Sequence, residues 1–344
     1  METMLMEQKD FLQLTLDNPN GIEQTFSYKL ADNTLVSVLD TGVITFEPEH
    51  PHGKDIILSC GVHGNETSPI ELCNGLITAI LSGQIEVKHR LMFIIGNPHA
   101  ILNFIRFIDE NMNRMFSGAH SRGEGLINPE RIRAAKLEQY VDQFYAGNQD
   151  PTQRIHYDLH TSIRGAVHPL FAVYPYRQNK PYLGREIMFM HGCGVDTILF
   201  HHEPTTTFSY YSSAKHHADA FTVELGKVFP LGENDMSLFE EARLRLTELI
   251  CDMPLQIEAY EQDKVNLFQV CRTIVKQTDA FKFTFSNDIL NFTAFEKGHE
   301  IATDGDLSIC IEASQEYVVF PNAKVPVGQR SLVCLIKANS IQII

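Results

Sequence analysis

The chain has few basic residues for its length. Lysine and arginine total 28 of 344 residues, against 43 aspartates and glutamates, so the formal net charge is -15 at pH 7. No block of clustered basic residues interrupts this acidic excess. Such a chain would be repelled by nucleic acids and by anionic membrane surfaces, so we expect neither as a partner.

The sequence also lacks the cysteine pattern of a disulfide framework. Its seven cysteines are scattered, include no C-x-x-C pair and are odd in number. We therefore expect reduced thiols and a cytoplasmic protein. No export signal is expected, because no cationic stretch leads into an apolar run. The densest apolar stretch, 91–95, is far too short to span a bilayer.

Motifs of three common enzyme classes are missing as well. The sequence contains no G-x-S-x-G nucleophile elbow, no G-x-x-x-x-G-K-[ST] phosphate loop and no G-x-G-x-x-G dinucleotide motif. These absences disfavour α/β-type serine hydrolases, P-loop nucleotidases and dinucleotide-dependent oxidoreductases.

The chain does have enough apolar sequence for a large core. Hydrophobic residues make up 44% of it, and its length suits one large domain plus a smaller one. Apolar strand-like runs alternate with helical spacing in the first part, which is typical of an α/β fold. Short β-like runs separated by Asn, Asp, Gly and Pro follow. We expect a larger domain over 1–254 and a small β domain over 255–344.

Individual elements can be predicted from these patterns. Ser68, Pro69 and Glu71 are the residue types of an N-cap, a first helical position and a capping box, so a helix should begin there. Asn128-Pro129 should begin another, with Ile132 on its apolar face, and a third is expected over about 237–251. The expected strands are 55–61, 91–96, 155–159, 172–174, 197–200 and 221–225, followed by 281–285, 317–320 and 332–336.

His63 and Glu66 occupy the connection between the first of these strands and the first helix. The spacing H-x-x-[DE] is weak evidence alone, because it also occurs at His52 and His216. Only the pair at 63 and 66 combines a strand end, a glycine that permits a tight turn and a helix start. Open α/β sheets bind ligands at this carboxyl edge. The pair is therefore a candidate metal site, with an ordinary structural pair as the alternative.

A third ligand would complete a catalytic zinc site of the His2Glu type, which leaves a fourth position for water. His160 is the best candidate, because it ends a strand-like run and should lie at the same sheet edge. Asp158, two residues earlier on the same strand face, could hydrogen-bond a ligand imidazole. For His160, a hydrogen-bonded core histidine is the alternative.

Hydrolysis also needs a base that does not itself bind the metal. Glu224 fits this role, because it interrupts the apolar run 221–226, where burial of a charge without a function would be costly. A glutamate at an exposed sheet edge is the alternative.

Four motifs together resemble the aspartoacylase and succinylglutamate desuccinylase family. They are His63-Gly64-Asn65-Glu66-Thr67, Asn113-Arg114-Met115-Phe116, Asp158-Leu159-His160-Thr161 and Glu224-Leu225-Gly226-Lys227. Their order and spacing agree too, and the resemblance covers nearly the whole chain. It implies a three-layer α/β/α zinc carboxypeptidase-like domain with a mixed sheet, plus a small C-terminal β domain. Ile163-Arg164-Gly165, Phe295-Glu296-Lys297-Gly298 and the segment 316–322 are similar to the bacterial desuccinylase branch.

The resemblance implies a reaction. We expect zinc-dependent hydrolysis of N-succinyl-L-glutamate to succinate and L-glutamate, the last step of arginine degradation by the succinyltransferase pathway. One zinc ion per subunit would be bound by His63, Glu66 and His160, and Glu224 would act on the activated water as general base and acid.

The resemblance also implies roles for three residues at the substrate. Arg106 would assist catalysis at the developing oxyanion, and Asn113 with Arg114 would bind the substrate. Arg164 is a further cation that could contact it. Three substrate carboxylates entering an acidic protein require local cations, and an arginine fork can hold a carboxylate through two hydrogen bonds. Solvated surface arginines are the alternative interpretation.

Two other functions remain open. The same metal site could serve an aspartoacylase-like deacylase of other acyl specificity, or a carboxypeptidase. A non-catalytic metal-binding protein could also have kept the fold, although the presence of Glu224 argues against this. The sequence leaves the number of subunits open.

Overall fold

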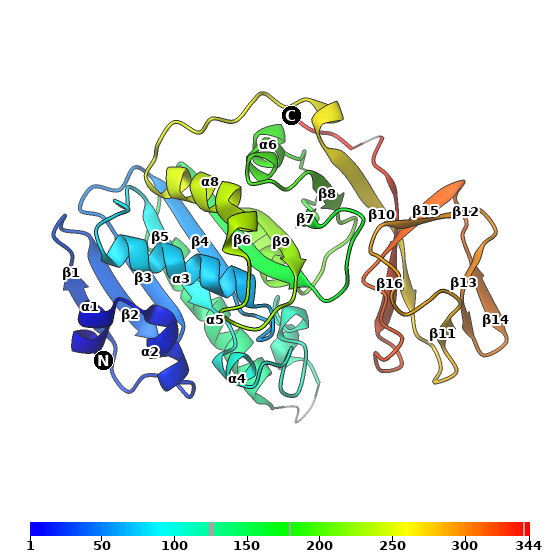
Figure 1. Ribbon diagram of the computed structural model, residues 1–344, viewed down its shortest axis with the longest axis horizontal. Helices are drawn as coiled ribbons and strands as arrows, with labels where there is room; N and C mark the ends of the chain where they lie inside the picture. Colours follow the sequence, from blue (N-terminus) through cyan, green and yellow to red (C-terminus); the bar gives the residue numbers. More distant parts are fainter. Residues whose placement is uncertain (124–126, 179, 340) are drawn as a thin grey trace.

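The computed structural model describes residues 1–123, 127–178, 180–339 and 341–344. A layered α/β part comprises most of the chain, and an all-β part formed by about the last quarter lies at one end of it (Figure 1). The expected α/β class with a mixed sheet is therefore confirmed. No helix in the described ranges is long and apolar enough to cross a membrane.

One sheet runs through both parts of the molecule. Within the described ranges it has the order β1-β2-β3-β5-β4-β6-β9-β7-β8-β10-β16-β15-β12. Its central strands β5, β4, β6 and β9 are parallel, whereas β3 and β7 pair antiparallel with β5 and β9. The strands of the first part are β1 (Phe26–Lys29), β2 (Leu35–Asp40), β3 (Val43–Glu47), β4 (Lys54–Cys60), β5 (Arg90–Ile95), β6 (Gln153–Ser162), β7 (Leu170–Tyr174), β8 (Thr197–Phe200) and β9 (Asp219–Lys227).

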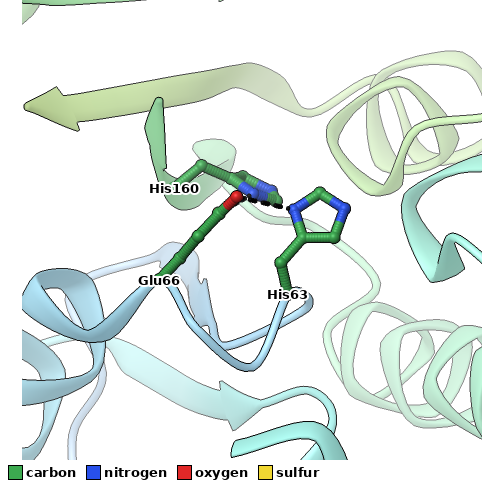
Figure 2. Close-up of side chains that lie close together, drawn as sticks. All are labelled: His63, Glu66 and His160. Atoms are coloured by element: carbon green, nitrogen blue, oxygen red, sulfur yellow. Dashed lines mark hydrogen bonds and ion pairs between the residues drawn. The ribbon is translucent and has the colours of Figure 1, made fainter. Parts of the chain in front are cut away.

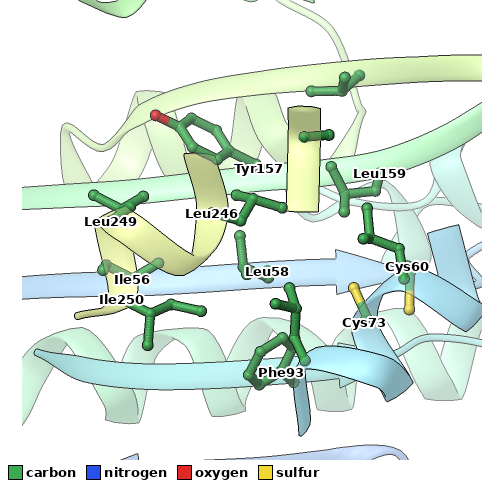
Figure 3. Close-up of a cluster of buried hydrophobic side chains, with 14 of the residues drawn as sticks. Ile56, Leu58, Cys60, Cys73, Phe93, Tyr157, Leu159, Leu246, Leu249 and Ile250 are labelled. Carbon is green, nitrogen blue, oxygen red and sulfur yellow. The ribbon is translucent and has the colours of Figure 1, made fainter. Parts of the chain in front are cut away.

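Helices cover both faces of this sheet, and for that reason its central strands are buried nearly throughout. On β4, Ile56 and Leu58 lie on the face that is covered by α3 and α8. Ile57 lies on the opposite face, which is covered by α5 and α7. Figure 3 shows the first of these clusters, with Leu246 and Leu249 of α8 above the strand. The main helices are α3 (Thr67–Leu81), α5 (Pro129–Ala146), α6 (Gly184–Gly192), α7 (Phe208–His216) and α8 (Glu240–Ile250).

The shorter helical elements lie mostly in the connections. They are α1 (Glu2–Gln8), α2 (Phe11–Asp17), α4 (Pro98–Leu102) and the 3-10 turns η1 (Met112–Arg114), η2 (Ala119–Ser121), η3 (Met236–Phe239) and η4 (Gln262–Lys264). The opening segment, for which the sequence predicted no element, thus contributes two helices and the three strands that extend the sheet at its far edge.

The C-terminal part is joined to the first part by the parallel pairing of β8 with β10. Phe171 and Leu199 of the first part share a core with Phe268 and Phe292, so the two parts pack directly. A separate sheet has the order β11-β13-β14. The C-terminal strands are β10 (Asn266–Val275), β11 (Lys282–Phe283), β12 (Thr293–Glu296), β13 (Glu300–Asp304), β14 (Leu307–Cys310), β15 (Gln315–Val319) and β16 (Arg330–Lys337).

The helix from Pro129 is confirmed, with Asn128 as a side-chain N-cap on Arg131 N–H. The predicted strands are confirmed as well, except that 281–285 contains only the short strand β11. Other details are wrong. Ile132 does not join the core but is 58% exposed, because the buried face of α5 carries Ala134, Leu137 and Val141 instead. The helices α6 and α7 were not foreseen.

The predicted capping box at the start of α3 is also wrong. The helix begins at Thr67, and its N-cap position is Glu66, whose side chain caps no helix N–H. Ser68 instead donates a hydrogen bond to the carbonyl of Leu225, 3.4 Å away. Glu71 accepts one from the N–H of Gly232 at 2.6 Å. Both side chains that the local pattern assigned to the helix N-terminus are thus hydrogen-bonded to residues distant in sequence instead.

Asn291 is expected to be important for stability, because its side chain fixes the end of β6 to the C-terminal part. Its buried amide donates to Ser162 Oγ at 2.8 Å and accepts from the N–H of Phe320 at 2.8 Å. Replacement by alanine leaves both partners unsatisfied, so Asn291→Ala should lower the free energy of unfolding by about 2 kcal/mol or more. Chemical denaturation measures this.

The exposed Asn103 provides the control for this measurement. Its amide bonds only the nearby carbonyl of His99 at the surface, so Asn103→Ala should change stability by about 0.5 kcal/mol or less. Equal effects of the two substitutions would contradict the assigned role of Asn291.

Candidate functional site

The loop after β4 is shaped by two glycines. Gly61 adopts a φ of +63°, which turns the chain sharply out of the strand. Gly64 lies so close to α4 that a Cβ there would be 2.0 Å from the carbonyl carbon of Ala100. The tight path of this loop places His63 just beyond the end of the strand and Glu66 at the start of α3.

His63, Glu66 and His160 come together at the carboxyl edge of the sheet, with one ligand atom from each lying within 4.8 Å of the others. The carboxylate of Glu66 points toward both imidazoles (Figure 2). Its Oε1 is 2.9 Å from His63 Nδ1, and its Oε2 is 2.8 Å from His160 Nδ1. All three side chains are almost completely buried. The grouping expected from the sequence is present in the fold.

The outer nitrogens of both imidazoles have acceptors of their own. His63 Nε2 lies 2.9 Å from Asn111 Oδ1, and His160 Nε2 lies 2.8 Å from Asp158 Oδ2. Both contacts favour a proton on Nε2, which leaves the Nδ1 lone pair directed toward Glu66. The position of Asp158 agrees with the strand-face argument. Asn111 was not singled out, because no local pattern indicates that it would face His63.

The donor set fits a metal ion. Two imidazoles and one carboxylate are the ligands of a catalytic zinc site. His63 Nδ1 is buried and has no hydrogen-bond partner among the described residues, although Glu66 is close. Burial and the charge of Arg106 lower the pKa of His63 to about 4, so it is neutral as a ligand must be. Burial opposes a charge on His160, but the charges of Asp158 and Glu66 outweigh this effect and raise the pKa of His160. The same negative charges would also favour a bound metal cation.

Glu224 lies next to this group but outside it. On β9 it pairs directly with His160 of β6, so the parallel register sets the two side by side. The carboxylate is buried, and its Oε2 has no hydrogen-bond partner among the described residues. Burial, together with the negative charge of Glu66, raises the pKa of Glu224 to about 7. A carboxylate in this state can both take up and release a proton near neutral pH.

Positive charge approaches the group from two segments of the chain. Arg106 Nη1 lies 2.5 Å from Glu66 Oε1. Arg114 donates to the carbonyl of Asn113 at 2.7 Å, and burial together with the charges of Arg330 and Arg106 lowers its pKa. Arg330 begins β16, so the C-terminal part adds a cation that sequence reasoning missed. Nothing local distinguishes it from other arginines in β-like runs.

Two other predicted residues make contacts within the protein. Asn113 Oδ1 accepts from the N–H of Phe208 at 3.0 Å, and its Nδ2 lies 3.3 Å from His160 Nε2. Arg164 donates to the carbonyls of Pro321, at 3.2 Å, and of Asn287. The guanidinium of Arg164 thus connects the loop after β6 to the C-terminal part.

Comparison with known proteins identifies the same two parts. Residues 52–250 match the model of the succinylglutamate desuccinylase/aspartoacylase catalytic domain, and residues 263–338 match that of the AstE/AspA barrel-sandwich hybrid domain. A curated relative, succinylglutamate desuccinylase of Shewanella woodyi, is 56% identical over 336 residues, which cover 98% of this chain and 97% of the relative.

Solved structures agree over nearly the whole length. Succinylglutamate desuccinylase from Chromobacterium violaceum superposes with a TM-score of 0.84 at 33% identity, covering 96% of this chain and 98% of the other. The enzyme from Vibrio parahaemolyticus gives a TM-score of 0.86 at 33% identity, covering 95% of this chain and 94% of the other.

Removal of one imidazole tests whether this group holds a metal. His160→Ala should reduce bound metal from a stoichiometric to a trace amount, because two remaining ligands bind weakly. Elemental analysis after dialysis measures the loss, and circular dichroism checks the fold. His191→Ala is the control, because His191 pairs with Asp196 away from the group and should leave metal content unchanged. Full metal content in His160→Ala would refute the assignment.

Proposed function

Because the chain belongs to the succinylglutamate desuccinylase/aspartoacylase family, we propose that it hydrolyses N-succinyl-L-glutamate to succinate and L-glutamate. The hydrolytic chemistry rests on one observation above all. The buried carboxylate of Glu224, whose Oε2 has no hydrogen-bond partner in the described part of the chain, lies on the strand next to a buried His-Glu-His group. The choice of substrate is supported by the full-length relatives named succinylglutamate desuccinylase. This reaction would end arginine degradation by the succinyltransferase route.

We propose one zinc ion per subunit, held by Nδ1 of His63, Nδ1 of His160 and the carboxylate of Glu66. Zinc supplies a Lewis acid for the amide carbonyl and lowers the pKa of a water molecule. Asn111 and Asp158 keep the Nε2 protons of the two histidines in place, so that each Nδ1 lone pair remains available.

Glu224 is proposed as the base that removes a proton from the attacking water and returns it to the departing glutamate nitrogen. Its raised pKa of about 7 suits both directions of transfer. Among the described residues Oε2 has no hydrogen-bond partner, which leaves that oxygen free to contact the reacting water.

Cations around the group are proposed to neutralise the substrate. Arg106 contacts Glu66, and we propose that it stabilises the oxygen on which negative charge develops. Arg114 and Arg330 bring two further charges into a largely buried region, which suits the carboxylates of a trianionic substrate. Asn113 remains a proposed substrate contact, and Arg164, held by backbone carbonyls, a weaker one.

Three further proposals follow from sequence and fold together. The division into a zinc hydrolase catalytic domain, 1–254, and a C-terminal β domain, 255–344, agrees with the spans of the two family models. A cytoplasmic location is supported by seven free cysteines. The excess of acidic residues supports a small molecule, rather than nucleic acid or a membrane surface, as the partner.

The substrate and the role of Glu224 can be tested together. Zinc-loaded protein should release glutamate from N-succinylglutamate, and Glu224→Gln should lower kcat by about a hundredfold or more while zinc content stays unchanged. N-acetylaspartate is the comparison substrate. Exclusive cleavage of N-acetylaspartate would replace the proposed substrate by that of an aspartoacylase. No cleavage of either by zinc-replete protein would favour another substrate or the non-catalytic alternative.

Arg106 has a prediction of its own. If it stabilises the developing oxyanion, Arg106→Ala should lower kcat by about a hundredfold or more, because loss of such a donor costs about 2.7–4 kcal/mol. Steady-state kinetics separate kcat from KM. A rise in KM with unchanged kcat would reassign Arg106 to substrate binding. The exposed Arg243, which pairs with Glu240, provides the control as Arg243→Ala.

A further inference from the structure

A chain of buried hydrogen bonds extends from His160 into the interior of the protein. Asp158 Oδ2 lies 2.8 Å from His160 Nε2, and Asp158 Oδ1 accepts from Ser59 Oγ at 2.5 Å. Ser59 Oγ is in turn 2.8 Å from His156 Nε2, and His156 Nδ1 is 2.7 Å from Ser212 Oγ. The chain of hydrogen bonds therefore connects a proposed metal ligand to Ser212 of α7, a helix that covers one face of the sheet.

The fold sets this path through strand register. His156, Asp158 and His160 alternate along β6 and so lie on one face of the sheet. Ser59 of the neighbouring β4 pairs with Asp158, and Ser212 reaches the same face from α7. All five side chains are at most 2% exposed, so water does not compete for these bonds.

The direction of every bond follows from the chemistry of its atoms. The Asp158 carboxylate only accepts, so Ser59 must give it its single hydroxyl proton. Ser59 then accepts from His156, which must carry its proton on Nε2. Burial lowers the pKa of His156 to about 4, so the ring is neutral and its Nδ1 accepts from Ser212. One proton arrangement therefore satisfies the whole chain.

We propose that Ser59, His156 and Ser212 are positioning residues for the metal site, whose hydrogen bonds hold Asp158 and thereby keep His160 Nδ1 aimed at the ion. This inference rests on the proposed metal site. Asp158 Oδ1 is held by Ser59, and without that bond the carboxylate can rotate away from His160. Ser59 is held in turn by His156, and His156 by Ser212.

A second buried serine on α7 separates this role from ordinary structural support. Ser209 Oγ lies 2.7 Å from Thr222 Oγ1, and Ser209 is 1% exposed. The Ser209–Thr222 bond joins the same helix to the sheet but leads to none of the three proposed ligands. Ser209→Ala thus removes a buried hydroxyl of matched burial without touching the chain to His160.

Zinc affinity of the full-length protein, measured by competition with a chelator, tests the proposal. Ser59→Ala should weaken zinc binding about 10–100-fold, the usual effect of losing an outer partner of a metal ligand. Ser212→Ala, at the far end of the chain, should cause a smaller loss in the same direction. Ser209→Ala should bind zinc like the unaltered protein, even where its melting temperature falls as much as that of Ser59→Ala.

The possible failures are distinguishable. If the unaltered protein binds no zinc, the proposed metal site is wrong. If it binds zinc and neither Ser59→Ala nor Ser212→Ala weakens binding, or Ser209→Ala weakens it equally, the positioning role is wrong. Should Ser59→Ala fail to fold, Ser212→Ala decides.

Nitrogen NMR of the histidine side chains in the metal-free protein provides an independent test, because it shows which ring nitrogen carries the proton. A neutral His156 protonated at Nε2 is the expected signature, and protonation at Nδ1 instead would overturn the assigned direction of the chain.

Discussion

The buried carboxylate of Glu66 joins the segments from which the site is made. Its two oxygens face His63 Nδ1, Arg106, His160 Nδ1 and the N–H of Thr161. A charge that is only 1% exposed would cost several kcal/mol without such partners. Each partner therefore has to be held in place by its own element of the fold.

Parallel strand register meets most of this requirement. Strands β4, β6 and β9 end at one edge of the sheet, so residues distant in sequence arrive side by side there. His160 and Glu224 are neighbours through register alone, and the loop after β4 needs only two glycines to bring His63 and Glu66 to meet them. The same register pairs Ser59 with Asp158 and so begins the hydrogen-bonded chain behind His160.

Three buried carboxylates, those of Glu66, Asp158 and Glu224, make this edge strongly negative. The proposed ion and the arginines around it would balance this charge locally, although the protein as a whole is acidic. The C-terminal part contributes one of these positive charges. Arg330 of β16 is near enough to Arg114 for its charge to lower the pKa of Arg114. The pairing of β8 with β10 and the hydrogen bonds of Asn291 fix the C-terminal part to the first part. They therefore hold Arg330 in a defined position near the site.

The sequence by itself determined the features that depend on neighbouring residues. Strand ends, the glycine turn before His63 and the Asn128 cap are local, and the isolated charge at Glu224 stands out against its apolar run. These features, with the family motifs, were enough to bring His63, Glu66, His160 and Glu224 into one hypothesis.

Only the tertiary structure decided which distant side chains meet. The start of α3 shifted because Ser68 and Glu71 found partners at 225 and 232, and Ile132 turned outward because other residues of α5 face the core. The contact of Asn111 with His63, and of Ser212 with His156, joins segments 48 and 56 residues apart. No periodicity or spacing encodes such contacts, because they arise when the packing of the whole sheet fixes which strands and loops are neighbours.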